Sequence, residues 1–298
     1  MTWEFERIAG PFSLAEGPVW DGEALLFTDI PVSRIMRYDP QTGRCDVHRA
    51  DTHSANGLRM DAQGRLIACE GGSRSITRYE RDGAVTVLAD GFEGQRLNSP
   101  NDIAIDSQGR VWFTDPRYEG GTVFDDGIGA LELAHESVYR LDPAPDGVWT
   151  IRRMTFDTTK PNGLLLSPDE KTLYVAQSHY GERNKRELRA YPIRDDDTLG
   201  PYEVLHNFYP HRGIDGMTLD TEGNIVATAG WQQSGPGPMI YVFAPNGRVL
   251  ETHPVPEDRP TNCTFGGEDL STLYVTTIDG WLLRAKTHCR GIVIGGVR

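Results

Sequence analysis

Cysteine and long apolar runs are scarce in this sequence. Four cysteines stand far apart in 298 residues with no C-x-x-C spacing, which argues against zinc-ribbon and disulfide-rich scaffolds (Cys45, Cys69, Cys263 and Cys289). No stretch approaches the roughly 18 apolar residues of a membrane-spanning helix. Residues 1–7 also lack the basic and apolar regions of a secretion signal. We therefore expect free, mostly buried thiols and a cytoplasmic protein.

Positive charge is also in deficit. The chain has 30 Lys and Arg against 43 Asp and Glu, a formal net charge of −13. Such a chain repels phosphate backbones and anionic membrane surfaces, so we expect neither nucleic acid nor membrane as a partner. We expect a small-molecule substrate instead, and a chain that is a monomer or a homodimer. The 33 Gly and 19 Pro are spread along the whole length, which favours a turn-rich all-β protein.

A unit of two strands joined by an acidic turn recurs six times. Each copy places a short apolar strand before the turn and a second, strongly apolar strand after it. The turn acids of the six copies are Asp21, Asp61, Asp106, Asp169, Asp220 and Asp269. A repeat of roughly 50 residues that is dense in Val, Ile, Leu, Thr and aromatics is typical of β-propeller blades.

Each unit continues into a third strand and usually a fourth, which predicts four-stranded antiparallel blades. The sixth unit has too little chain left for a full outer strand, and the N-terminal segment 3–9 is placed to supply it. We therefore predict an all-β fold, a six-bladed propeller formed by residues 1–298 as one domain. A two-sheet sandwich would leave the six repeats unexplained.

The residue that opens each first strand carries a side-chain oxygen in all six units. In chain order these residues are Glu16, Asn56, Asn101, Asn162, Asp215 and Asn262, and a glycine follows four of them. Turn capping by Asn and Asp would explain one or two such positions but not six. Because the innermost strands of a propeller line its central channel, we expect these side chains to converge near the axis.

Converging oxygens that include two carboxylates suit a hard divalent cation. Carboxylate, amide and water oxygens are the preferred ligands of Ca²⁺ and Mg²⁺. Glu16 and Asp215 together supply a charge of −2, which matches that of the ion. We expect one divalent ion at the axis, Ca²⁺ first, with Zn²⁺, Mn²⁺ and Mg²⁺ as alternatives. The absence of His and Cys from these six positions argues against a dedicated structural zinc site.

The loop after each second strand returns to the face above this ring of six. Arg117, Tyr118, His179 and Trp231 lie in these loops and predict a polar, aromatic rim around a small oxygenated molecule. Residues 116–136 form a long loop containing Gly pairs, which is either a lid or a disordered insertion.

Several segments resemble the SMP-30/gluconolactonase family, in family order and over nearly the whole chain. They are AEGPVW from Ala15, LNSPND from Leu97, PNGL from Pro161, IDGM from Ile214, and FGG from Phe265 with LYVT from Leu273. The resemblance implies a six-bladed propeller with a metal held by Glu16, Asn162 and Asp215. It also implies that Asn101 is a further ligand or a substrate contact.

Two positions depart from the family pattern. Gly71-Gly72-Ser73-Arg74 stands where many bacterial relatives have a histidine, which puts one substrate contact in doubt. Arg117 interrupts the usual pair of prolines and places a cation near the pocket. An acidic or highly hydroxylated substrate would suit that cation.

Our leading hypothesis is hydrolysis of a sugar-type lactone to its hydroxy acid. The ion would polarise the carbonyl, and Asp215 would take the proton from the attacking water. Asn56, Asn101 and Asn262 would orient the substrate by hydrogen bonds. Two alternatives stay open, a phosphotriester or fluorophosphate hydrolase that uses the same site, and a non-catalytic propeller that only binds calcium.

Overall fold

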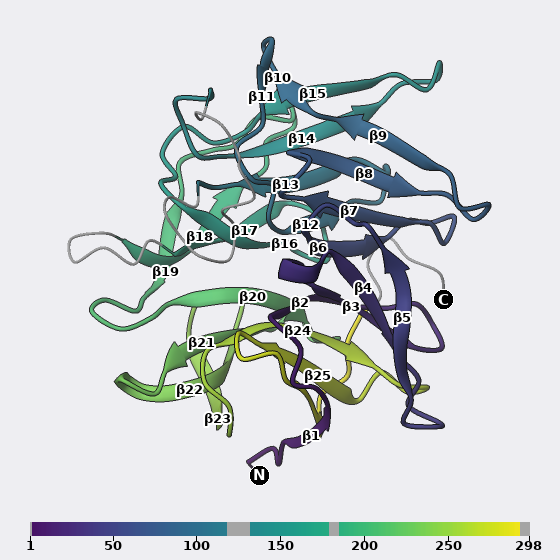
Figure 1. The fold of residues 1–298 in the computed structure, drawn as a ribbon. Helices are drawn as coiled ribbons and strands as arrows, with labels where there is room; N and C mark the ends of the chain where they lie inside the picture. The colour runs from purple at the N-terminus through teal and green to yellow at the C-terminus, as the bar shows by residue number, and fades with distance from the viewer. Residues whose placement is uncertain (1, 118–131, 179–184, 293–298) are drawn as a thin grey trace.

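The computed structural model describes residues 2–117, 132–178 and 185–292 of the chain. It is built from six four-stranded antiparallel sheets that are arranged as the blades of a propeller, which confirms the predicted fold (Figure 1). A short two-stranded hairpin of β10 (Gly91–Phe92) and β11 (Gln95–Arg96) extends one blade connection. Within the described ranges, no helix is long and apolar enough to cross a membrane.

The first three blades each take four consecutive strands along the chain. Blade 1 contains β2 (Ala15–Trp20), β3 (Leu25–Asp29), β4 (Arg34–Tyr38) and β5 (Cys45–Ala50), with a 3-10 turn η1 (Ile30–Val32) after β3. Blade 2 contains β6 (Ala55–Met60), β7 (Leu66–Glu70), β8 (Ser75–Tyr79) and β9 (Val85–Ala89). Blade 3 contains β12 (Ile103–Ile105), β13 (Val111–Asp115), β14 (Ser137–Pro143) and β15 (Trp149–Arg153).

The last three blades follow the same order until the ring closes. Blade 4 contains β16 (Pro161–Leu166), β17 (Thr172–Ser178), β18 (Arg186–Pro192) and β19 (Glu203–Asn207). Blade 5 contains β20 (Ile214–Leu219), β21 (Ile225–Trp231), β22 (Ser234–Phe243) and β23 (Val249–Pro254). Blade 6 contains β24 (Pro260–Gly266), β25 (Thr272–Thr277), β26 (Leu282–Lys286) and the N-terminal strand β1 (Glu6–Ala9).

The N-terminal strand closes the ring as the sequence predicts. β1 pairs antiparallel with β26, with Glu6 opposite Arg284, and the Arg284 Nε atom lies 2.6 Å from the Glu6 Oε1 atom. Further upstream, the Trp3 ring stacks on His253 of blade 5 at a centroid distance of 3.9 Å. The first and last parts of the chain therefore share one blade, in which β1 is the outer strand.

Apolar side chains fill the spaces between neighbouring blades. Leu165 and Tyr174 of blade 4 pack in one buried cluster with Met217 and Phe243 of blade 5. The second strand of each blade is buried over nearly its whole length, as in β3 and β13, and is rich in apolar residues. This packing fixes where each first strand begins, and hence where its opening residue points.

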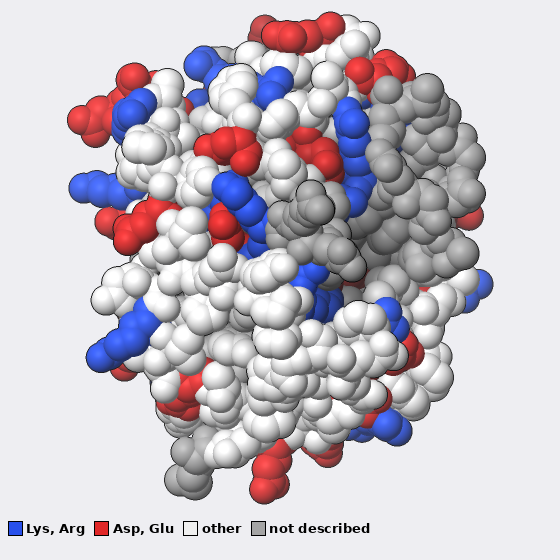
Figure 2. All heavy atoms as spheres, turned by 90° about the vertical axis from the view of Figure 1, so that its left-hand side faces the viewer, with Lys and Arg blue, Asp and Glu red and all other residues white. Residues whose placement is uncertain are grey.

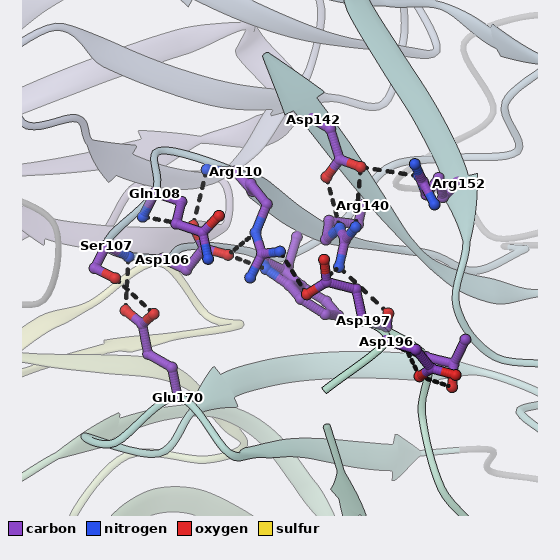
Figure 3. Close-up of polar contacts among 12 residues, drawn as sticks. Asp106, Ser107, Gln108, Arg110, Arg140, Asp142, Arg152, Glu170, Asp196 and Asp197 are labelled. Carbon is purple, nitrogen blue, oxygen red and sulfur yellow. Dashed lines mark hydrogen bonds and ion pairs between the residues drawn. The ribbon is translucent and has the colours of Figure 1, made fainter. Parts of the chain in front are cut away.

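The predicted acidic turns lie between the first and second strands and are internally hydrogen-bonded. In the Asp106 turn, the Oδ1 atom accepts the backbone N–H groups of Gln108 and Arg110 at 3.0 and 2.9 Å. The Arg110 guanidinium lies between Asp106 and Asp197, which ties blade 3 to blade 4 (Figure 3). These carboxylates accept hydrogen bonds from their own turns and pair with nearby arginine, so they stabilise the turns and the contacts between blades.

Candidate functional site

The six strand openings meet around a common axis. Contacts run from blade to blade in a closed circle, joining Gly17 to Asn56, Gly57 to Asn101, Asp102 to Leu164, Gly163 to Asp215, Gly216 to Asn262 and Thr261 to Ala15. All six predicted ring side chains are buried, with at most 8% of any residue exposed: Glu16, Asn56, Asn101, Asn162, Asp215 and Asn262. Residues distant in sequence are therefore neighbours at the centre of the propeller.

In blades 2, 4 and 5, a β-bulge at the strand opening explains why these side chains turn toward the axis. In blade 5 the pairing register shifts between Ile214 and Met217, which leaves Asp215 and Gly216 outside the regular ladder. The same shift occurs in blades 2 and 4 at the Asn-Gly pairs. Bulges re-aim side chains in this way at many functional sites.

In blade 6 the strand-pairing register moves the residue equivalent to the other ring residues by one position from the one that the sequence pattern indicates. There the shift falls between Pro260 and Cys263, so Thr261 and Asn262 occupy the two bulge positions. Thr261 corresponds to Asp215, and Asn262 corresponds to the glycine that follows it. The sequence could not reveal this because two adjacent polar residues fit the pattern equally well. The Asn262 side chain still reaches the axis, where it hydrogen-bonds Glu16.

Glu16, Asn162 and Asp215 come together at the axis. The Asn162 Nδ2 atom donates to the Asp215 Oδ1 atom at 2.6 Å. The Glu16 carboxylate accepts the backbone N–H of Gly17 and a hydrogen bond from Asn262. The predicted ligand set is thus assembled from blades 1, 4 and 5.

Burial and mutual repulsion perturb the carboxylates of the ring. Burial raises the pKa of Glu16 well above its ordinary value, and the charges of Asp215 and Asp102 raise it further. Burial also raises the pKa of Asp215, against the opposing effects of Arg212 and Asn162. Burial raises the pKa of Asp102 to about 6, with Arg59 opposing it. Perturbed groups that converge on one point mark a candidate functional site.

Three charged residues of this centre escaped the sequence-based prediction. Asp102 stands at the bulge position where four blades have glycine, and this exception was the one available signal. Arg212 pairs with the Asp215 Oδ2 atom, while its Nη1 atom donates to the Gly230 and Pro260 carbonyls at 3.1 Å each. Arg59 donates to the Ile103 carbonyl at 3.2 Å and faces Asp102 from the channel. No sequence pattern marks either arginine.

The centre has the composition of a cation site for a hard ion. Glu16, Asp102 and Asp215 carry three potential negative charges, whereas Arg59 and Arg212 supply two positive ones. Over the described parts of the chain, no group of three or more His, Cys, Asp and Glu side chains is arranged to hold a metal ion. The donors at the axis are instead carboxylates mixed with amides, which are ligand types that Ca²⁺ prefers.

The rim residues are only partly placed by the structure. Arg117 follows β13, where its backbone N–H donates to Glu136 at 2.6 Å and its guanidinium donates to the Leu133 carbonyl. Trp231 ends β21, and the Arg259 guanidinium lies 6.0 Å from its ring centroid. Tyr118 and His179, like most of the loop 116–136, lie outside the described residues. Figure 2 shows Lys and Arg atoms in the middle of the side that lies on the left in Figure 1.

The two ends of the channel differ. A small cavity of about 40 Å³ lies near the turn end, lined by Arg59 and by apolar residues that include Leu219 and Ile292. The Ile292 N–H donates to the Leu219 carbonyl at 3.4 Å, which places the end of the described chain across this part of the channel. A much larger crevice of about 1620 Å³ follows the N-terminal segment, and no ring residue lines it.

Comparison with known proteins finds relatives that are named as lactonases. A gluconolactonase from Zymomonas mobilis is 32% identical over 312 residues, covering 96% of this chain and 82% of the relative. The pentonolactonase XacC from Haloferax volcanii is 30% identical, covering 90% of this chain and 82% of the relative. The solved gluconolactonase XC5397 from Xanthomonas campestris superposes with a TM-score of 0.83 at 33% identity, covering 95% of this chain and 89% of that one.

The family assignment rests on most of the chain. Residues 14–279 match the family described as SMP-30/Gluconolactonase/LRE-like region. This range includes all six ring residues and excludes only the N-terminal closure and the end of the chain. The protein therefore belongs to the SMP-30/gluconolactonase family.

Proposed function

We propose that this protein hydrolyses a small sugar-type lactone to its hydroxy acid with the help of one divalent cation. Glu16, Asn162 and Asp215 would hold the ion, Ca²⁺ in the first instance, and Asn101 would be a further ligand. The observation that carries the proposal is the buried excess of carboxylates on the propeller axis. The similarity to a gluconolactonase and a pentonolactonase supports a lactone as substrate.

The ring residues have distinct tasks in this proposal. When bound, a divalent cation polarises a carbonyl group and lowers the pKa of water. Glu16 and Asp215 supply the compensating charge, and the Asn162 hydrogen bond at 2.6 Å fixes one oxygen of Asp215. The hydrogen bond from Asn262 and the Gly17 N–H hold the Glu16 carboxylate. The site is thus organised before substrate arrives, which lowers the reorganisation needed during the reaction.

Asp215 is the proposed acceptor of the proton from the attacking water. Its hydrogen bonds with Arg212 and Asn162 favour the ionised form, which is the form that accepts a proton. The same contacts weaken it as a base, against the burial that raises its pKa. Positioning and charge stabilisation therefore supply more of the rate than proton transfer does.

Substrate contacts are proposed both at the ring and at the rim above it. Asn56, Asn101 and Asn262 would hydrogen-bond the substrate from the ring, while Arg117 and Trp231 would contact it from the rim. Tyr118 and His179 are proposed for the same rim on their sequence positions. Because the Arg117 guanidinium is engaged by the Leu133 carbonyl, its contact with substrate requires that hydrogen bond to open.

An indicator assay that follows acid release tests the proposal. The purified protein is offered a panel of aldonolactones and a panel of phosphotriesters, as purified, after EDTA, and after Ca²⁺ is restored. We expect hydrolysis of at least one lactone that EDTA abolishes and Ca²⁺ restores. Hydrolysis of phosphotriesters alone would favour the alternative substrate class. Inactivity on both panels with Ca²⁺, Mg²⁺, Mn²⁺ and Zn²⁺ would leave the non-catalytic propeller.

A further inference from the structure

We propose that Asn262 is a positioning residue that orients Glu16 for cation binding, and that glycine at position 216 exists to let its side chain through. This inference rests on the proposed function and deepens it. It concerns the bulge position that the sequence pattern assigned incorrectly. Four blades place glycine there, whereas blade 6 places an amide.

The orientation of the Asn262 amide is fixed by its own backbone. The Asn262 Oδ1 atom accepts the backbone N–H of Cys263 at 2.8 Å. An amide group has an acceptor on one side and donors on the other, so its Nδ2 group is directed at Glu16. The hydrogen bond between Asn262 and Glu16 therefore has the amide as donor and the carboxylate as acceptor. Asn262 itself is buried, so water does not compete freely for this contact.

Glycine is required at position 216 by a neighbouring side chain and not by its own backbone conformation. Its φ angle is not in the left-handed region that favours glycine. A Cβ atom at this position would instead overlap Asn262, whose Cγ, Oδ1 and Nδ2 atoms are the three nearest heavy atoms. All three atoms are absent from alanine. A methyl group at 216 would thus push the amide away from Glu16 without altering Asn262.

The contact matters because Glu16 has carboxylates as neighbours. Asp215 and Asp102 both repel its charge, so Glu16 alone has no reason to stay beside Asp215. Asn262 and the Gly17 N–H supply the donors that hold it there. Residues that hold a metal ligand in this way typically contribute about 10- to 100-fold to metal affinity.

Ca²⁺ titration by calorimetry of the EDTA-treated full chain provides the test. We expect Asn262→Ala to weaken Ca²⁺ binding about 10- to 100-fold. The matched control is Asn224→Ala, which also removes a buried amide that donates to a carboxylate, the Asp220 Oδ2 atom at 2.9 Å. Because Asn224 lies in the turn between β20 and β21, this control should lower the melting temperature and leave Ca²⁺ affinity unchanged.

A double-mutant cycle separates positioning from general damage. Gly216→Ala should weaken Ca²⁺ binding as Asn262→Ala does, and adding it to Asn262→Ala should weaken binding no further. Additive losses, or an Asn262→Ala affinity within about twofold of the parent, would overturn the inference while leaving the proposed function intact. If Asn262→Ala does not fold, Gly216→Ala alone carries the test, and unchanged Ca²⁺ affinity would overturn it. A parent chain that binds no divalent cation would remove the proposed function and this inference with it.

Discussion

Carboxylates gather in two regions of this propeller and experience opposite environments. At the turns between first and second strands, each aspartate is met by donors from its own turn. Hydrogen bonds from Ser271, helped by Lys286, lower the pKa of Asp269 to about 2. At the axis, burial and neighbouring carboxylates raise the pKa of Glu16 well above its ordinary value. The same type of group is stabilising in one region and costly in the other.

This difference separates structure from function. The turn aspartates need nothing beyond the fold, because backbone N–H groups two to four residues away satisfy them. The ring carboxylates come from different blades and lack enough positive charge nearby. A fold retains such a costly arrangement where a ligand or a reaction uses it. The comparison supports the axis as the candidate site, and substitutions in the two regions should have contrasting effects.

The largest contrast is expected between Asp215→Asn and Asp269→Asn. Asp215→Asn removes a proposed cation ligand and proton acceptor, so lactone turnover should fall at least about 100-fold. Asp269→Asn alters an exposed turn at the far end of blade 6 and should leave turnover unchanged. Initial rates at saturating lactone and Ca²⁺, with circular dichroism as a check of folding, measure both. Full turnover in Asp215→Asn would refute its role.

The same contrast explains how far the sequence could predict the molecule. Turn acids and apolar strands recur with a period, and the period alone predicts six blades and the closing strand β1. The ring openings were predictable because the start of each first strand carries a polar residue at a repeated position. Arg59 was not, since it meets Asp102 of another blade only through the fold. Arg212 lies three residues before Asp215, but it appears in a single blade, so no repeat marks it. The one-residue error at Asn262 arose because a bulge changes register without changing the local pattern.

A second contrast concerns stability. Asp220→Ala would leave the backbone N–H groups of Glu222 and Asn224 and the Asn224 amide without their acceptor. Loss of an acceptor by buried donors costs about 1–3 kcal/mol, so the free energy of unfolding should fall by that amount. Lactone turnover per folded molecule should not change, because the turn lies at the opposite end of β20 from Asp215. Urea denaturation measures the first quantity, and a loss of specific activity without unfolding would contradict the separation of the two regions.

The smallest and most diagnostic effect is expected from Glu16→Gln in cation-free protein. A raised pKa means that ionised Glu16 costs stability, and this cost grows as the pH rises from its ordinary pKa of about 4 through its folded value. Glu16→Gln should therefore melt a few degrees above the parent at pH 8, at about 2–4 °C for each kcal/mol. The gap should shrink toward pH 5, where the parent takes up the proton.

Calcium should reverse that order, because an ion bound only by the folded parent stabilises it by mass action. Melting curves of parent and Glu16→Gln at pH 5 and pH 8, each with EDTA and with excess Ca²⁺, test both parts of this prediction. Asp269→Asn is the control, since the lowered pKa of Asp269 confines its own pH dependence to values below about 4. A melting gap that is equal at both pH values would mean that Glu16 carries no buried charge. The distinction between ring and turn carboxylates would then fail at the residue where it is expected to be greatest.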